Sequence, residues 1–417
     1  MKVLWLCNVV LPKVSEYLGM SISPVGGWLT GLSEELLKQE NISLTVCFPT
    51  RKAVSGVCPE RLSFYGVTRK NQREQFERIL KKEHPDVVHI FGTEMTHTLE
   101  MVNACERHGL LNRVVVNIQG LVSVLARHYF EGLERSAFFS PTLRSVFWGD
   151  SVWGAQRKFI KNGKSEILAL KKVRHVVGRT DWDKACSLRI NPNLRYHFCN
   201  ESLRNAFYGE ERWNLEKCEK YSIFVSQCSY PIKGFHYVLE AMADILRDYP
   251  EAHIYTTGRD LLRPVSLIDR LKMTSYQKYL AKLIRHYGLS DKITFLGMLG
   301  EKEIKKRYLK SHVFVSASTC ENSPNSVGEA MILGCPVVTS DVGGVKNLLI
   351  HEQEGYIYQS SAPYMLAYYM KRIFSDSKIA NYFSQNARSH AKNTHDRTVN
   401  LDRTVAIYNE ITVGRSI

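Results

Sequence analysis

Two glutamates, Glu321 and Glu329, lie in the stretch of the chain whose residue types are best suited to chemistry. An apolar run at 312–316 is typical of a buried strand, a polar loop follows, and a helix is expected to begin near Ser326. Carboxylates accept hydrogen bonds from hydroxyl groups, and backbone N–H groups at a helix start can hold phosphate. The stretch therefore predicts a site for a phosphorylated polyol, although Glu329 taken alone could be only a favourable anion in a first helical turn.

Apolar runs alternate with amphipathic helical patterns along the whole chain, and they form two series. The strand-like runs are 2–7, 43–48, 86–91, 113–118 and 173–178 in the first series, and 221–226, 252–257, 292–296, 312–316 and 335–339 in the second. This alternation predicts parallel sheets with helices on both faces. Because the polar stretch 191–220 separates the series, we expect an α/β protein of two doubly wound, Rossmann-like domains, residues 1–205 and 206–390.

Length, charge and cysteine usage agree with this organisation. A chain of 417 residues suits two domains of about 200 residues. The net charge of +15 favours an anionic partner, which could be a nucleotide, a phospholipid surface or a nucleic acid. No apolar run is long enough to span a membrane, and the N-terminus lacks the cleavage site of a signal peptide. Ten scattered cysteines indicate reduced, buried thiols in a cytoplasmic protein, and no cluster has the spacing of metal ligands, so we expect no metal.

The stretch 312–344 resembles the E-x7-E signature of the retaining GT-B glycosyltransferases of family GT4. The likeness continues from Ala330 to Ser340 and includes Gly343-Gly344. It implies two Rossmann-like domains facing across a cleft, with the final segment 391–417 packing back on the first domain. It also implies that Glu329 binds the ribose hydroxyls of a nucleotide, that Glu321 contacts the transferred sugar, and that the backbone around Ser323, Asn325 and Ser326 meets the sugar and phosphate.

A second segment of the same family is similar to residues 226–242. The resemblance places Lys233 where a lysine neutralises the donor diphosphate, and a cation there stabilises charge that grows on the leaving group. Cys228 stands where the family usually has an arginine. Paired glycines before a helix allow a backbone to approach a ligand closely. The further donor contacts that we expect are Gly26 and Gly27, in the stretch Ser23–Trp28, and Gly297 and Met298, after the run 292–296.

Candidates on the acceptor side are less specific and follow predicted strands of the first series. Gln119 occupies the place of a histidine that serves the donor sugar in many relatives, so it joins Glu321 and Lys233 as a candidate catalytic residue. In this family the leaving phosphate is thought to accept the acceptor proton, so no enzyme base is required. The acceptor contacts that we expect are Glu94, His97, His128 and Arg179. His128 could instead be an ordinary surface histidine. Arg179 could instead form an ion pair beside a helix cap at Asp181 or Asp183.

These features predict a retaining glycosyltransferase that moves a sugar from a nucleotide-diphosphate sugar to an acceptor hydroxyl without a cofactor. Residues 185–192 and 199–204 resemble a subgroup that builds surface polysaccharides, so we expect a lipid-linked glycan acceptor of capsule, exopolysaccharide or O-antigen synthesis. The basic stretch 157–174 has interleaved apolar residues and suits an anionic membrane on its cytoplasmic face, although a solvated helix face is equally consistent. Three alternatives remain: a sugar-nucleotide epimerase or hydrolase, a catalytically silent scaffold, and a nucleic-acid-binding protein, although no nucleic-acid motif is present.

Overall fold

The chain forms two compact units. The computed structural model describes residues 1–21, 26–59, 61–139, 142, 144, 149, 151–262 and 273–413. The first unit comprises Met1–Ser123, Ile160–Asn205 and Thr394–Ile417, and the second comprises Val124–Phe159 and Ala206–Asn393. Residues 124–159, which we expected in the first domain, therefore belong to the second unit. The physical reason is that α6 (Arg135–Phe138) packs against α12 (Ser275–His286).

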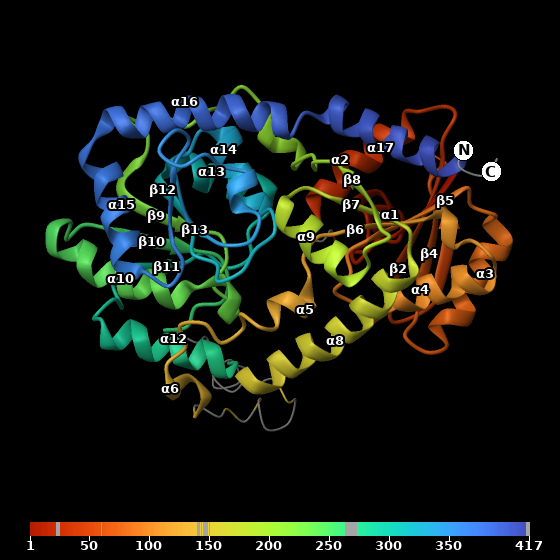
Figure 1. Ribbon diagram of the computed structural model, residues 1–417. Coiled ribbons are helices and arrows are strands. Elements are labelled where there is room, and N and C mark those ends of the chain that lie inside the picture. Colours follow the sequence, from red (N-terminus) through yellow and green to blue (C-terminus); the bar gives the residue numbers. More distant parts are fainter. Residues whose placement is uncertain are drawn as a thin grey trace. The chain divides into compact units, whose positions relative to one another are not determined.

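The first unit is built on an eight-stranded sheet in the order β3-β4-β2-β1-β5-β6-β7-β8 (Figure 1). Its strands are β1 (Lys2–Leu6), β2 (Ser43–Pro49), β3 (Val54–Val57), β4 (Ser63–Val67), β5 (Val87–Phe91), β6 (Val114–Asn117), β7 (His175–Gly178) and β8 (Arg195–Phe198). All neighbours are parallel except the edge pair β3–β4. The order reverses between β1 and β5, so the crevice beyond their carboxyl ends is the expected ligand site of a doubly wound sheet.

Helices cover both faces of this sheet, and the last of them closes the core. They include α1 (Pro12–Tyr17), α2 (Gly27–Leu37), α3 (Gln72–Glu83), α4 (Thr96–Arg107), α9 (Asp181–Ile190) and α17 (Arg397–Val413). The helix α17 contacts α2 and β5. Its buried Tyr408 accepts a hydrogen bond from Trp5 Nε1 at 3.0 Å, and its hydroxyl lies 2.7 Å from His89 Nδ1. The C-terminal helix is thus part of the hydrophobic core of the first unit.

The second unit is built on a six-stranded, fully parallel sheet in the order β11-β10-β9-β12-β13-β14. Its strands are β9 (Glu219–Val225), β10 (His253–Thr256), β11 (Ile293–Phe295), β12 (Ser311–Ser316), β13 (Val337–Asp341) and β14 (Tyr356–Gln359). This is the strand order of a dinucleotide-binding fold, and it reverses between β9 and β12. The predicted α/β class with two Rossmann-like units is therefore confirmed.

The helices of the second unit connect these strands on both faces. They are α6 and α12, with α10 (Phe235–Asp248), α13 (Glu301–Lys310), α14 (Asn325–Leu333), α15 (Pro363–Ser375) and α16 (Ser377–Thr394) (Figure 1). A further helix, α8 (Val152–Lys172), contains most of the basic stretch 157–174. None of the helices in the described ranges has the length and apolar character needed to cross a membrane. All ten cysteines are free, and eight of them are buried.

Candidate functional site

Two of the predicted catalytic side chains meet at the strand-order reversal of the second unit. Lys233 follows β9 and Glu321 follows β12, and Lys233 Nζ lies 2.7 Å from Glu321 Oε2. Their side chains are 19% and 20% exposed, so both still reach solvent. Burial alone would lower the pKa of Lys233, but the charge of Glu321 and the hydroxyl of Tyr230 raise this pKa above its usual value. The crevice therefore presents a permanent cation beside a carboxylate.

The loop that carries Lys233 is fixed against the loop after β12. Residues Pro231–Lys233 form the 3-10 turn η3, and the backbone N–H of Thr319 donates to the carbonyl of Ile232 at 2.8 Å. Gly234 then begins α10 with φ +64°, a conformation that favours glycine. A Cβ at this position would overlap the carbonyl oxygen of Ala317. Close approach of two backbones thus positions the lysine relative to Glu321.

We expect Gly234→Ala to destabilise the second unit by about 3 kcal/mol, because the new methyl group meets both an unfavourable φ and a backbone carbonyl. Chemical denaturation followed by circular dichroism measures this loss. Gly288→Ala is the matched control, because Gly288 has φ +65° in the same unit and nothing lies within 4 Å of its added Cβ. Equal losses in the two variants would show that the contact with Ala317 does not matter.

Glu321 is held by a second close backbone approach. Ser318 Oγ donates to Glu321 Oε2 at 3.1 Å, and the backbone N–H of Gly344 donates to the Glu321 carbonyl at 3.2 Å. Gly343 has φ +53°, and a Cβ there would overlap the same carbonyl. The Gly343-Gly344 pair of the sequence motif therefore lets the chain after β13 pass directly behind Glu321.

Glu329 is placed differently from Glu321, on the buried side of α14. It is 3% exposed, and the phenol of Tyr308 on α13 donates to Glu329 Oε2 at 3.3 Å. The same hydroxyl lies 3.0 Å from the carbonyl of Ser326. Ser323, Asn325 and Ser326 are half-buried around the start of α14. The phenol of Tyr308 thus orients one carboxylate oxygen of Glu329. The start of α14 offers backbone N–H groups that can hold a phosphate.

The residues after β9, β10 and β11 pack together beside this crevice. Cys228 is buried, its thiol donates to the carbonyl of Thr257 at 3.3 Å, and burial raises its pKa to about 11. It is therefore a neutral thiol and supplies no charge in place of the usual arginine. Gly258 and Gly297 exchange backbone hydrogen bonds of 2.9 and 3.1 Å. Met298, the next predicted contact, is 83% exposed and free to meet a ligand.

A buried histidine on α10 makes the stability of the second unit depend on pH. His236 lies 3.0 Å from Tyr276 Oη and 3.2 Å from the carbonyl of Glu131, and burial lowers its pKa to about 4. The unfolded chain binds this proton near pH 6.5, so stability is expected to fall by about 1.4 kcal/mol per pH unit between pH 6.5 and 4. Urea titrations over this range measure the slope. His236→Gln should reduce the slope by about 1.4 kcal/mol per pH unit and leave the contribution of His312, whose pKa burial also lowers to about 4. An unchanged slope would assign the effect to other groups.

The strand-order reversal of the first unit also gathers polar side chains. Asn8 follows β1, and Glu94 and His97 follow β5; Asn8 Oδ1 lies 2.6 Å from His97 Nε2, and Asn8 Nδ2 lies 3.5 Å from Glu94 Oε2. Burial raises the pKa of Glu94 to about 7, with a smaller effect from the charge of Glu166, and burial lowers the pKa of His97 to about 4. The structure thus brings two of the four predicted acceptor residues together through Asn8. Sequence reasoning missed Asn8, although it directly follows the first predicted strand.

Glu166 is a second residue that sequence reasoning missed. It is fully buried on α8 and accepts hydrogen bonds from Thr93 Oγ1 at 2.6 Å, from Val122 N at 3.0 Å and from Ser123 N at 2.9 Å. It therefore fixes the loop after β6 beside the loop after β5. The available signal was that Glu166 is the single acid within the basic stretch 157–174.

Gln119 and Arg179 converge on Glu201, a third residue that sequence reasoning missed. Gln119 Nε2 donates to Asn117 Oδ1 and to Glu201 Oε1, and Arg179 Nη1 donates to Glu201 Oε2 at 2.8 Å. Arg179 and Glu201 are buried. Asp183 is the helix-cap partner, because it accepts from Arg179 N and forms a capping box with Thr180 at the start of α9. The ion pair expected for Arg179 is therefore present, but its partner is Glu201.

The remaining predicted residues are Gly26, Gly27 and His128. Gly26 has φ +84°, and an added Cβ would lie 2.6 Å from Val9 Cγ2; a Cβ on Gly27 would overlap the side chain of Arg204. Ser23–Val25 lie outside the described residues. His128 belongs to the second unit rather than the first, where its carbonyl accepts from Thr319 Oγ1 at 3.1 Å and its ring pairs with Glu131.

One group of three possible metal ligands is found among the described residues: His175 on β7, His197 on β8 and Glu410 on α17. The nitrogens His175 Nδ1 and His197 Nε2 lie 3.0 Å apart, and Arg195 Nε lies 2.6 Å from Glu410 Oε1. Burial lowers the pKa of His175 to about 4. The imidazoles thus pair with each other and the carboxylate pairs with a guanidinium, which accounts for the group without an ion.

The family model that matches this protein covers only part of the chain, within the second unit. Residues 209–390 match the model of the family described as glycosyl transferases group 1. An uncharacterized glycosyltransferase of Methanocaldococcus jannaschii is 28% identical over 190 residues, which cover 46% of this chain and 45% of that protein. The chain therefore spans about half the length of the curated relatives it matches.

Two solved structures resemble almost the entire chain. Sucrose-phosphate synthase from Thermosynechococcus elongatus has a TM-score of 0.72 at 14% identity, covering 99% of this chain and 100% of that one. The HepE protein of Anabaena, solved in complex with UDP-glucose, has a TM-score of 0.68 at 14% identity, covering 98% and 100%. Residues 209–390 are therefore similar to the group 1 glycosyltransferases, and the chain has the fold of the GT-B glycosyltransferases.

Proposed function

We propose that the protein is a retaining glycosyltransferase that moves a sugar from a nucleotide-diphosphate sugar to an acceptor hydroxyl. The observation that carries this proposal is the placement of Lys233 and Glu321 at the reversal of a dinucleotide-type sheet, with Glu329 buried on the adjoining α14, beyond its first turn. Ligands of open α/β sheets bind at this place. The resemblance to the HepE protein, solved with UDP-glucose, supports a nucleotide sugar as the donor.

In this proposal the three charged residues have separate tasks. Glu329 accepts hydrogen bonds from the ribose hydroxyls, while N–H groups at the start of α14 meet the sugar and phosphate. Lys233 shifts from Glu321 to the diphosphate and stabilises the charge that develops as the glycosidic bond breaks. Glu321 then faces hydroxyl groups of the transferred sugar. No enzyme base is required, because the leaving phosphate takes the proton of the acceptor hydroxyl.

The proposed acceptor is a lipid-linked glycan of surface-polysaccharide synthesis, used at the cytoplasmic face of a membrane. The helix α8 supports this proposal, because Trp153, Ile160 and Leu168 are 50%, 44% and 51% exposed and lie among exposed lysines and arginines at helical spacing. Such a face can lie on an anionic lipid surface, where each cation contributes about 1 kcal/mol. The first unit supplies the acceptor contacts, with Glu94 and His97 as the leading candidates.

The test is to incubate the full-length protein with UDP-, GDP- and dTDP-sugars and to measure nucleotide release with and without a membrane lipid extract. Release that depends on the extract, with the sugar recovered in the lipid fraction, is the expected result. Release at the same rate without the extract would identify a hydrolase instead. Liposome flotation tests the membrane contact: Trp153→Ser with Leu168→Ser should abolish flotation with anionic vesicles, and equal flotation with neutral vesicles would contradict the role of α8.

A further inference from the structure

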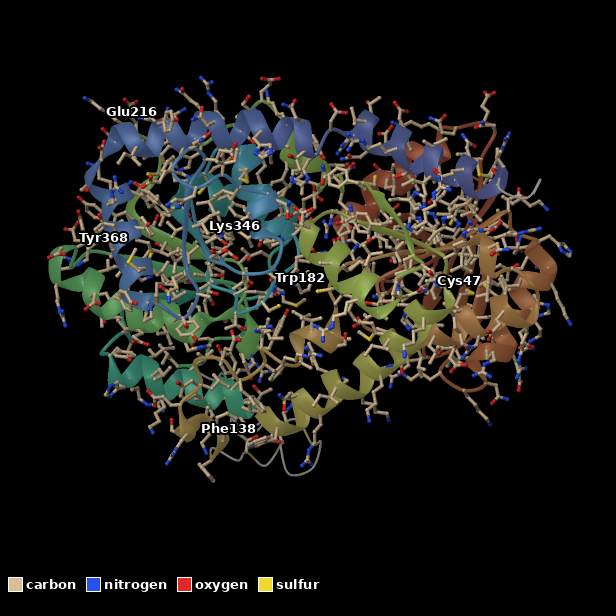
Figure 2. All side chains as sticks on the ribbon, in the orientation of Figure 1. Cys47, Phe138, Trp182, Glu216, Lys346 and Tyr368 are labelled. Atoms are coloured by element: carbon tan, nitrogen blue, oxygen red, sulfur yellow. The ribbon has the colours of Figure 1, made fainter. Side chains whose placement is uncertain are left out.

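A polar groove of about 700 Å³ lies in the second unit and is not lined by Lys233, Glu321 or Glu329. One wall is the five-residue segment 212–216, and the other is a face of α16. Figure 1 shows α16 as one long helix along the edge of this unit, and Figure 2 shows Glu216 beside it. A volume of this size is in the range of small-molecule sites. The groove is therefore large enough to accommodate a ligand of its own.

The face of α16 that lines the groove is a single helical stripe of about 22 Å, at 1.5 Å per residue from position 377 to position 392. Its first part carries uncharged side chains that hydrogen-bond: Ser377, Asn381, Ser384 and Gln385. Hydroxyl and amide groups both donate and accept, which matches the hydroxyl groups of a sugar. A helix face that serves only solubility is usually rich in lysine and glutamate instead.

Three cations gather where this stripe ends: Arg388 and Lys392 on α16 and Arg212 on the opposite wall. Burial and the neighbouring charge of Arg212 lower the pKa of Arg388, and the charge of Glu210 offsets only part of this effect. Arg388 also donates through Nη1 to the carbonyl of Ile332, so its guanidinium is held at the wall. Glu216 is the single acid among the lining residues. An anionic group bound between the two arginines would relieve their repulsion and accept hydrogen bonds from both.

We propose that this groove binds an acidic oligosaccharide, with the sugar hydroxyls along the stripe of α16 and an anionic group between Arg212, Arg388 and Lys392. A nucleic acid fits less well, because three cations are few for a polyphosphate and the lining aromatic residue, Trp213, is only 4% exposed and cannot stack on bases. The inference goes beyond the proposed transfer reaction and does not depend on it, because the donor residues lie outside the groove.

The experiment is calorimetric titration of the full-length protein, without any nucleotide sugar, using three probes: oligogalacturonate, a neutral maltooligosaccharide of the same length, and a single-stranded oligonucleotide of the same charge. We expect oligogalacturonate to bind most tightly. Arg212→Ala combined with Lys392→Ala should weaken it roughly tenfold. Asn381→Ala combined with Gln385→Ala should weaken both saccharides and leave the oligonucleotide unaffected. Lys378→Ala, which removes a cation of α16 outside the groove, should change nothing.

Three results would overturn the proposal. They are the absence of oligogalacturonate binding up to about 1 mM, tighter binding of the oligonucleotide, and an equal loss of affinity in Lys378→Ala. The variant Glu329→Gln separates this proposal from the donor site. It should retain oligogalacturonate binding in full, and loss of binding in that variant would place the saccharide at the donor site instead.

Discussion

Lys233→Met is expected to lower the turnover number of sugar transfer by about 100- to 1,000-fold, with a smaller change in the dissociation constant of the donor. The cation lies 2.7 Å from Glu321 at the strand-order reversal, where the diphosphate is proposed to bind. Its interaction with the diphosphate strengthens as negative charge accumulates on the leaving group, and the loss should therefore appear mainly in kcat. Initial rates at saturating donor, together with titration of the donor, separate the two quantities.

Two further variants test whether the loss of rate comes from the missing cation itself. Because Lys233→Met leaves Glu321 without its partner, the double variant with Glu321→Gln removes the unpaired carboxylate and should remain equally slow. Lys346→Met is the control, because Lys346 is 68% exposed and pairs with Asp341 in the same unit (Figure 2); it should keep the rate of the parent protein. A Lys233→Met enzyme within about threefold of the parent rate would remove Lys233 from the leaving-group site.

Glu329→Gln is expected to weaken nucleotide binding by about 10- to 150-fold. The reason is that hydrogen bonds to a charged carboxylate contribute about 1.5–3 kcal/mol, and the substitution removes that charge. The substitution keeps the shape of the side chain and an oxygen for the phenol of Tyr308, so folding should be preserved. Calorimetric titration with UDP, GDP and dTDP measures the loss and also identifies the base. Glu303→Gln, a first-turn acid of the neighbouring α13, is the matched control. An unchanged affinity in Glu329→Gln would mean that the ribose lies elsewhere.

The parts of the site that the sequence could predict are those that lie within one short segment. Glu321, Glu329 and Gly343-Gly344 follow in order along one strand–loop–helix–strand unit, and the glycine pair contacts the backbone of Glu321. The alternation of apolar runs also predicted the strands at the centre of both sheets. The edge strand β8 was missed because it lies inside the polar stretch 191–220 and has an exposed, charged pattern, and the edge strand β3 is likewise half-exposed. The strands β4 and β14 were also missed, although most of their residues are buried.

The parts that could not be predicted depend on residues far apart in the chain. Asn8 meets His97 only because β1 and β5 are neighbours in the sheet, and Glu201 meets Gln119 only because β6, β7 and β8 follow one another in the sheet. Glu166 stands out locally as the single acid of the basic stretch 157–174, but the local pattern does not show that this carboxylate is buried under the loop after β6. The assignment of His128 to the first unit failed for the same reason, since its neighbours come from residues near Thr319.

The position of Tyr408 on α17 has a consequence for synthesis on the ribosome. The first unit needs this tyrosine against Trp5 and His89, yet residues 206–393 of the second unit are made before it. Domains generally fold in the order in which they emerge, at about 5–20 residues per second. The first unit is therefore begun before the second but completed after it, so its core stays open until α17 has been translated. A ribosome that stalls before α17 leaves this core exposed to proteases and chaperones.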